Sequence, residues 1–259
     1  MFGVVSLDQS PIRVRHITLE HPWQWLSAAW ADMANAPVVS LTYGGVFALV
    51  GFLLMYGLES LGAGYLILPL ALGFAIVAPA AAVGLYETSR RLSRGEPATL
   101  MAALTAVGRN PGQIGLLGVF LVIILLAWTR LAMLEFMLFF GAAPPSVDDL
   151  VGAILLSDQA FPFLLVGFLS GGAMALGVFT ITAVAVPMLV DRKVDAVTAM
   201  LASLEAVKVN PKPMLLWAFL IAMFTLFGLG LFLIGLVLTL PLVGHASWHA
   251  YRDLIDPGA

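Results

Sequence analysis

Residues 200–229 read MLASLEAVKVNPKPMLLWAFLIAMFTLFGL, and this pattern decides the fold because it occurs twice more in a looser form. A short amphipathic segment is followed by a proline and then by a long apolar run. The other copies are residues 26–56, LSAAWADMANAPVVSLTYGGVFALVGFLLMY, and residues 100–130, LMAALTAVGRNPGQIGLLGVFLVIILLAWTR. The prolines are Pro37, Pro111 and Pro211. The repetition predicts three structural units built to one plan.

The composition indicates an integral membrane protein. Of the 259 residues, 61% are apolar and only 10% are charged, whereas roughly a quarter of a soluble domain is charged. The chain has no cysteine, which excludes disulfides, thiolate metal sites and cysteine-held clusters. No nucleophile elbow, zinc-protease helix, phosphate loop or dinucleotide fingerprint is present. We therefore expect no enzymatic activity and no cofactor.

Six membrane spans are predicted, since a helix needs about 20 apolar residues to cross a membrane. Their bounds are 38–58, 61–86, 113–134, 160–190, 213–228 and 230–251. The last two divide the apolar stretch 214–244, which we interpret as a hairpin broken near Gly228 and Gly230 whose second span extends to about 251. One long tilted helix over 214–251 is the alternative. Short amphipathic helices at 22–35, 96–109 and 194–209 precede the three pairs and are predicted to lie in the membrane interface.

The predicted fold is therefore an all-α integral membrane protein with six transmembrane helices in three tandem repeats. Each repeat is an interfacial amphipathic helix followed by a two-span hairpin. Repeats with one polarity, related by an axis along the membrane normal, suggest pseudo-threefold symmetry. An N-terminal segment covers residues 1–21, and the repeats cover 22–95, 96–193 and 194–259.

The distribution of charge predicts the orientation. Under six spans every basic residue except Arg130 falls on one side, and the other side carries acidic residues: Glu59, Glu135, Asp148, Asp149 and Asp158. The positive-inside rule then places both termini and the short helices in the cytoplasm. Arg130 is expected near the outer interface, within reach of Glu135 or Glu59. Basic clusters beside spans favour contact with anionic lipids, so we expect a bilayer and no nucleic acid as partner.

The apolar cores of the spans contain no ionisable residue, which argues against a proton relay, an ion pump and a voltage sensor. His245 and His249 stand four residues apart on one helix face, the spacing of two metal ligands. They are candidates for half of a metal or haem site, with Glu87 or His21 as further ligands. The alternative is a water-facing helix end, because His249 and Glu87 occupy equivalent positions after Pro241 and Pro79.

Two further sets of residues are candidates. The fourth span carries small residues that let another helix, in this chain or a partner, approach closely: Gly167, Gly171, Gly172, Ala175 and Gly177. Four hydroxyl residues could line a solute path, namely Tyr43, Tyr65, Thr180 and Thr182. The alternative for the hydroxyls is bonding to their own helices or to neighbouring ones.

Three stretches carry a family resemblance: VRHITLEHPWQWLSAAWADMANAP at 14–37, GGVFALVG at 44–51 and PAAAVGLYETSRRLSRGEP at 79–97. They resemble the bacterial integral membrane proteins catalogued as domain of unknown function 2189. Some members of that family carry a cytochrome c oxidase subunit label. The resemblance implies six spans, a bacterial inner membrane and an accessory link to respiration.

These observations predict a non-enzymatic accessory or scaffold subunit that associates with other membrane protein subunits, such as a respiratory oxidase. The alternative is a transporter or carrier for an uncharged or hydrophobic solute with pseudo-threefold symmetry. A central cavity lined by the hydroxyl residues would favour the alternative.

Overall fold

The computed structural model describes residues 12–141, 152 and 156–256. Helices and the turns that connect them make up this part of the chain, and its one β-type pairing is an isolated bridge between Val14 and Ile255. The prediction of an all-α protein is therefore confirmed. Most of the polar loop expected at 141–159, with Asp148 and Asp149, lies outside the described residues.

Pairs of long helices follow short ones along the chain. The first unit contains α1 (His21–Asn35), α2 (Pro37–Ser60), η1 (Gly64–Leu66), α3 (Ile67–Ala81) and α4 (Val83–Leu92). The second contains α5 (Leu100–Leu104), η2 (Ala106–Arg109), α6 (Pro111–Phe140), α8 (Ala160–Thr182) and α9 (Ala185–Asp191). The third contains α10 (Ala196–Val209), α11 (Pro211–Gly230) and α12 (Leu236–Leu254).

Several predicted bounds need correction. The span expected at 61–86 breaks at Ala82, three residues after Pro79, which itself lies inside α3. The span expected at 160–190 likewise breaks at Ala183 and Val184. The interfacial helix expected at 96–109 is reduced to the short α5 and η2, with Thr99 accepting the N-terminal hydrogen bond from Ala102.

The same bend precedes α2, α6 and α11. Its residues Ala36, Asn110 and Asn210 have φ of −133°, −153° and −126° and ψ of 55°, 66° and 55°. The Asn110 amide donates to the Val194 carbonyl and the Asn210 amide donates to the Arg15 carbonyl, each at 2.9 Å. These bonds tie the end of one short helix to the segment before another. The three-repeat plan as a whole stays a prediction.

Five helical segments in the described part are long and apolar enough to cross a membrane: Pro37–Ser60, Gly64–Ala81, Pro111–Phe140, Ala160–Asp191 and Pro211–Gly230. The six predicted spans are thus not confirmed, because α12 is not among the five. Its second half carries Ser247, His249, Arg252 and Asp253, which shorten its apolar stretch. Residues 214–251 form two helices and not one.

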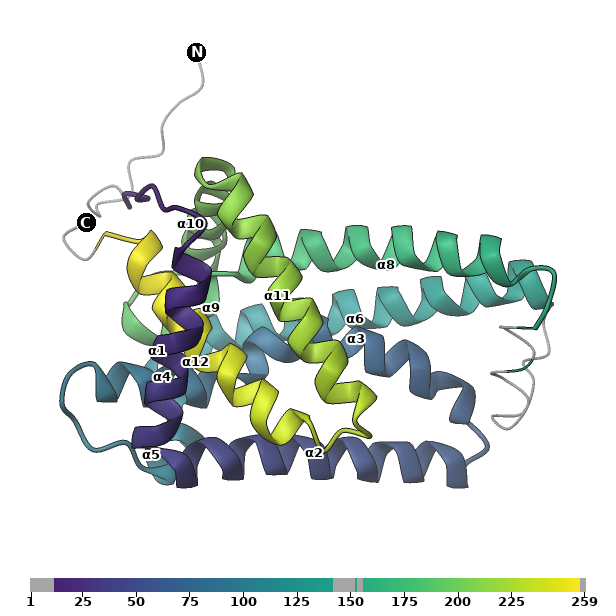
Figure 1. The fold of residues 1–259 in the computed structure, drawn as a ribbon, viewed down its shortest axis with the longest axis horizontal. Helices are drawn as coiled ribbons and strands as arrows, with labels where there is room; N and C mark the ends of the chain where they lie inside the picture. The colour runs from purple at the N-terminus through teal and green to yellow at the C-terminus, as the bar shows by residue number, and fades with distance from the viewer. Residues whose placement is uncertain (1–11, 142–151, 153–155, 257–259) are drawn as a thin grey trace, which may run out of the picture.

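The two described chain ends lie together at one end of the molecule (Figure 1). Val14 pairs with Ile255, and Arg15 forms an ion pair with Asp256 at 3.0 Å. An odd number of crossings would separate these ends across a membrane. Hence α11 and α12 either cross as a pair or enter and leave on the same side.

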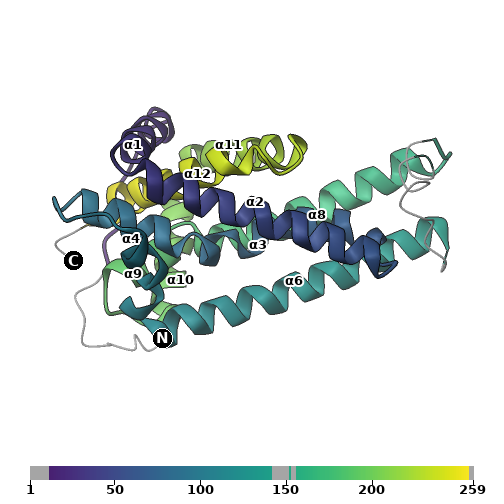
Figure 2. The same cartoon turned by 90° about the horizontal axis from the view of Figure 1, so that it is seen from below.

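The α11–α12 turn stops well short of the far ends of α2, α6 and α8 in both views (Figures 1 and 2). A Cβ added at Gly51 of α2 would lie 2.8 Å from the Leu233 side chain of that turn. Gly51 is about 21 Å along α2 from Pro37 by the helical rise, and α2 continues to Ser60. The turn between α11 and α12 therefore lies beside the middle of α2 and not beside its far end, although α11 is long and apolar enough to cross a membrane.

The largest core of the protein lies at the end that holds the termini. Three tryptophans, Trp25, Trp217 and Trp248, are almost completely buried there, where α1, α4, α9, α10, α11 and α12 meet. The Trp25 indole donates to Asp253 at 2.7 Å and so ties α1 to α12. At the other end, α2, α6 and α8 expose large apolar side chains, as expected of surfaces that face lipid tails.

Candidate functional site

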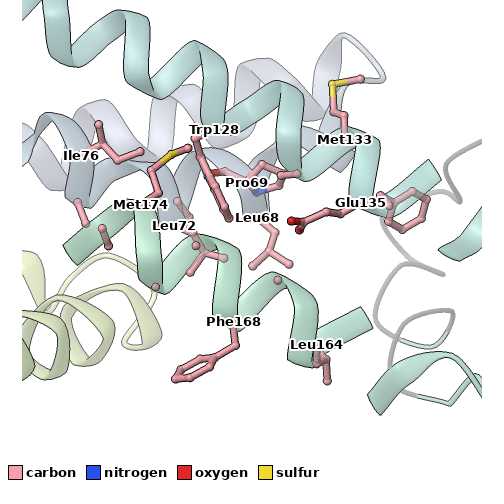
Figure 3. Close-up of a pocket in the computed structure, with 18 of the residues that line it drawn as sticks. Leu68, Pro69, Leu72, Ile76, Trp128, Met133, Glu135, Leu164, Phe168 and Met174 are labelled. Carbon is pink, nitrogen blue, oxygen red and sulfur yellow. The ribbon is translucent and has the colours of Figure 1, made fainter. Parts of the chain in front are cut away.

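A cavity of about 670 Å³ lies between α3, α6, α8 and α11. Its walls are mainly apolar, and Figure 3 shows Leu68, Ile76, Trp128, Phe168 and Met174 around it. The volume falls in the range of roughly 300–1,000 Å³ that is typical of small-molecule sites. Because Phe168 is 77% exposed, the rim of the cavity opens sideways, where lipid tails would meet it.

Small residues on α8 leave room for this cavity. Gly167, Gly171, Gly172 and Ala175 all line it, and Gly177 does not. A Cβ at Gly171 would lie 2.9 Å from the Trp128 ring, so this glycine lets the indole pack against α8. The Trp128 Nε1–H donates to the Pro69 carbonyl at 2.8 Å, which fixes the ring as one wall.

One carboxylate points into the cavity. Glu135 is only 6% exposed, and Figure 3 shows its carboxylate turned toward the apolar lining. A Cβ at Gly167 would lie 3.7 Å from Glu135 Oε2. Among the residues that the structure describes, Glu135 has no hydrogen-bond or ion-pair partner, and the expected contact with Arg130 is not formed.

Of the four hydroxyl residues expected along a solute path, only Tyr65 lines the cavity. The Tyr43 hydroxyl donates to the Ala81 carbonyl. Thr180 and Thr182 each donate to a carbonyl one turn earlier in α8, at 2.7 Å. The sequence argument did not place Glu135 and Trp128 in a cavity, although their spacing of seven puts them on one face of α6.

A second polar group of residues is buried at the other end of the protein. The Ser89 hydroxyl donates to Asp32 at 2.6 Å and lies 2.7 Å from His245 Nδ1. His245 Nε2 lies 3.0 Å from the Ser40 hydroxyl, and His249 Nε2 lies 2.9 Å from Asp32. These five residues come from α1, α2, α4 and α12, so the hydrogen bonds join those helices.

The bonding around His245 selects one tautomer. Burial lowers the pKa of His245 to about 4, although the Asp32 carboxylate opposes the shift and His249 adds to it, so the ring is neutral at pH 7. A neutral ring donates through one nitrogen and accepts through the other. Ser89 directs its single proton to Asp32, so we assign the ring proton to Nδ1, which donates to Ser89. Nε2 then accepts from Ser40, which shares its proton with the Ala36 carbonyl at 2.9 Å.

The proposed metal pair is therefore engaged in hydrogen bonds. His245 is fully buried between two serines, while His249 lies beside Asp32. The additional ligands considered from the sequence lie elsewhere, since Glu87 accepts bonds from arginines and His21 Nδ1 lies 3.1 Å from the Thr18 amide. In the described ranges, no group of three His, Cys, Asp or Glu residues has an arrangement suited to a metal ion.

Glu87 is the centre of a cluster of basic residues at the same end. It accepts hydrogen bonds from Arg90 at 2.7 and 2.8 Å and from Arg91 at 2.9 Å, and Arg109 lies 3.6 Å away. Burial by itself would raise the pKa of Glu87, but the bonds from Arg90 and Arg91 outweigh it, and the pKa lies below its usual value. These ion pairs stabilise α4 and connect it to Arg109 at the end of η2.

The apolar helices, the lateral cavity and the basic end together define a helical, multi-pass integral membrane protein. Residues 67–191 match the family described as "Predicted integral membrane protein (DUF2189)", and the resemblance expected from the sequence is confirmed for this region. The matched region contains the stretch 79–97, whereas 14–37 and 44–51 precede it. No curated protein and no solved structure matches the chain.

Proposed function

We propose that the protein is a non-enzymatic carrier that takes up a hydrophobic molecule from the bilayer. The observation that supports this function is the cavity of about 670 Å³ between α3, α6, α8 and α11. A pocket with apolar walls and a rim exposed toward lipid favours molecules that already partition into the membrane. This proposal develops the carrier alternative of the sequence analysis, with a lateral cavity in place of a central path.

Quenching of tryptophan fluorescence tests this function, because Trp128 forms one wall of the cavity. The protein is placed in lipid nanodiscs and titrated with dodecyl compounds that carry bromine on the tail and differ in head group. Gly172→Phe fills the cavity, since nothing lies within 4 Å of a Cβ added there. Gly177→Phe is the matched control, on the same helix, with equally open space and outside the cavity lining.

We expect part of the quenching to disappear in Gly172→Phe and to persist in Gly177→Phe. Equal quenching of the wild-type protein and Gly172→Phe by every probe in the series would refute a binding function for the cavity. Folding of each variant is checked by its thermal unfolding midpoint in the same nanodiscs.

An accessory-subunit role is a second proposal. It is supported by Gly177 and Ala173, which lie exposed on α8, so a helix of another subunit could approach this strip closely. The other four small residues line the cavity, which weakens this support relative to the carrier. A native gel of mildly solubilised membranes tests it: a complex with other subunits, such as a respiratory oxidase, is expected, and a lone chain of 27.5 kDa with its detergent contradicts it.

We also propose a bacterial inner membrane location with both termini in the cytoplasm. Most of the described basic residues lie with the two chain ends, including Arg15, Arg94, Lys208 and Arg252. The positive-inside rule places such an end in the cytoplasm.

A further inference from the structure

We propose that the cavity binds a single-chain amphiphile whose head group is a positively charged primary amine, held by the Glu135 carboxylate. The proposal rests on the proposed function, because it names the chemical class of molecule that occupies the same cavity. Two independent features support it, namely the burial of an unpartnered carboxylate and the direction in which the apolar cavity extends from it.

The carboxylate needs a partner that the described part of the chain does not supply. The Glu135 side chain points into the cavity (Figure 3) and is more than nine-tenths buried. An ionised carboxylate that leaves water without a partner is strongly disfavoured. A bound ammonium group compensates the charge and offers three hydrogen-bond donors to the two carboxylate oxygens.

The cavity extends from Glu135 in the direction of a lipid tail. By the helical rise, Glu135 lies about 36 Å along α6 from Pro111. This places the carboxylate near the far boundary of a hydrocarbon core roughly 30 Å thick. The lining of α8 runs from Phe163 to Ala175, about 18 Å along its axis, back toward the basic end. A bound molecule would hold its head at the membrane boundary and its tail parallel to the surrounding lipid.

The lining selects against other head groups. None of the residues described in the cavity wall is Lys, Arg or His, so a fatty acid would place a second negative charge beside Glu135 without compensation. An alcohol would leave the carboxylate charge unpaired. The volume suits one molecule of drug-like size better than a phospholipid with two tails.

The test compares two probes, dodecylamine and dodecanol, each brominated on the tail, in nanodiscs of zwitterionic phosphatidylcholine. The signal is the quenching that Gly172→Phe removes and Gly177→Phe retains. We expect the amine to bind at least tenfold more tightly than the alcohol. Glu135→Gln should abolish this preference, whereas Glu59→Gln, which changes an exposed carboxylate on α2, should preserve it.

Each outcome separates this inference from the carrier proposal. Equal binding of both probes, or a preference for the amine that survives in Glu135→Gln, overturns the assignment of the head group while the cavity remains a binding site. Absence of cavity-dependent quenching by either probe overturns both. Equal binding of amine and alcohol by the wild-type protein overturns the head-group assignment even if Glu135→Gln fails to fold.

Discussion

Acid should destabilise this protein through His245, and His245→Gln should remove that part of the effect. The imidazole is fully buried between Ser40 and Ser89, and its pKa falls from the ordinary 6.5 to about 4. Between these values the unfolded chain binds a proton that the folded chain does not. Stability is therefore complete above pH 6.5 and decreases as the pH falls toward 4.

The size of the effect follows from the two pKa values. The difference between 6.5 and about 4, at about 1.4 kcal/mol per pKa unit, corresponds to about 3 kcal/mol. For soluble domains of comparable length, 1 kcal/mol moves the unfolding midpoint by roughly 2–4 °C. The wild-type midpoint should therefore drop by on the order of 10 °C more than that of His245→Gln between pH 7 and pH 4.

Thermal unfolding in mild detergent, followed by circular dichroism at half-unit pH steps, measures this difference. His16→Gln is the control, because His16 is exposed and its removal should leave the pH dependence unchanged. The other ionisable groups are common to both proteins, so the difference between the two curves reports on His245 together with its coupling to Asp32 and His249. Parallel curves for wild type and His245→Gln across this range would refute the reasoning.

Three further predictions concern packing, charge and topology. Gly44→Ala should destabilise the fold by about 1–3 kcal/mol, because the added Cβ would lie 2.5 Å from the Val237 carbonyl oxygen. Gly45→Ala should leave the stability unchanged, because nothing lies within 4 Å of a Cβ added there. Thermal unfolding midpoints of the two variants measure the difference. Glu87→Gln should lose about 3 kcal/mol in the same assay, because the buried Arg90 keeps only the longer contact of 3.5 Å with Glu96. The exposed Glu205→Gln should be neutral. In this cysteine-free chain, a membrane-impermeant thiol reagent should label Lys208→Cys from one side and Ser60→Cys from the other. Phe232→Cys in the α11–α12 turn should react from neither side, and labelling together with Ser60→Cys would instead establish a sixth span.

Hydropathy was sufficient to predict the helices that lie among lipid tails. The starts of α2, α6 and α11 at Pro37, Pro111 and Pro211 follow from the proline pattern, because proline suits the first helical turn. The depth of the α11–α12 hairpin could not be predicted in this way. It depends on contacts of Gly44 and Gly51 with Val237 and Leu233, which are distant in sequence, and apolar composition alone does not specify such contacts.

The site was predictable only in part, for a similar reason. The small residues of α8 indicated a face that admits a close neighbour, and Gly171 indeed admits Trp128. Whether the rest of that face is filled or hollow depends on the side chains that α3, α6 and α11 present to it. The burial of His245 could not be predicted from the sequence either, because its partners Ser40 and Ser89 lie 205 and 156 residues away in the chain.

Buried carboxylates at the two ends of the protein differ in whether they have hydrogen-bond or ion-pair partners. This difference identifies Glu135 as the functional candidate. At the end with the termini, Glu87 is bonded to Arg90 and Arg91, and Asp32 is bonded to Ser89. Asp191 accepts bonds from Arg94 and from the Tyr251 hydroxyl. A chain that supplies partners for these carboxylates leaves Glu135 without one among the described residues, in the wall of a cavity large enough for a ligand. Since a polar group that is buried without a hydrogen-bond partner is unfavourable, the partner of Glu135 is best sought in a molecule that enters from the membrane.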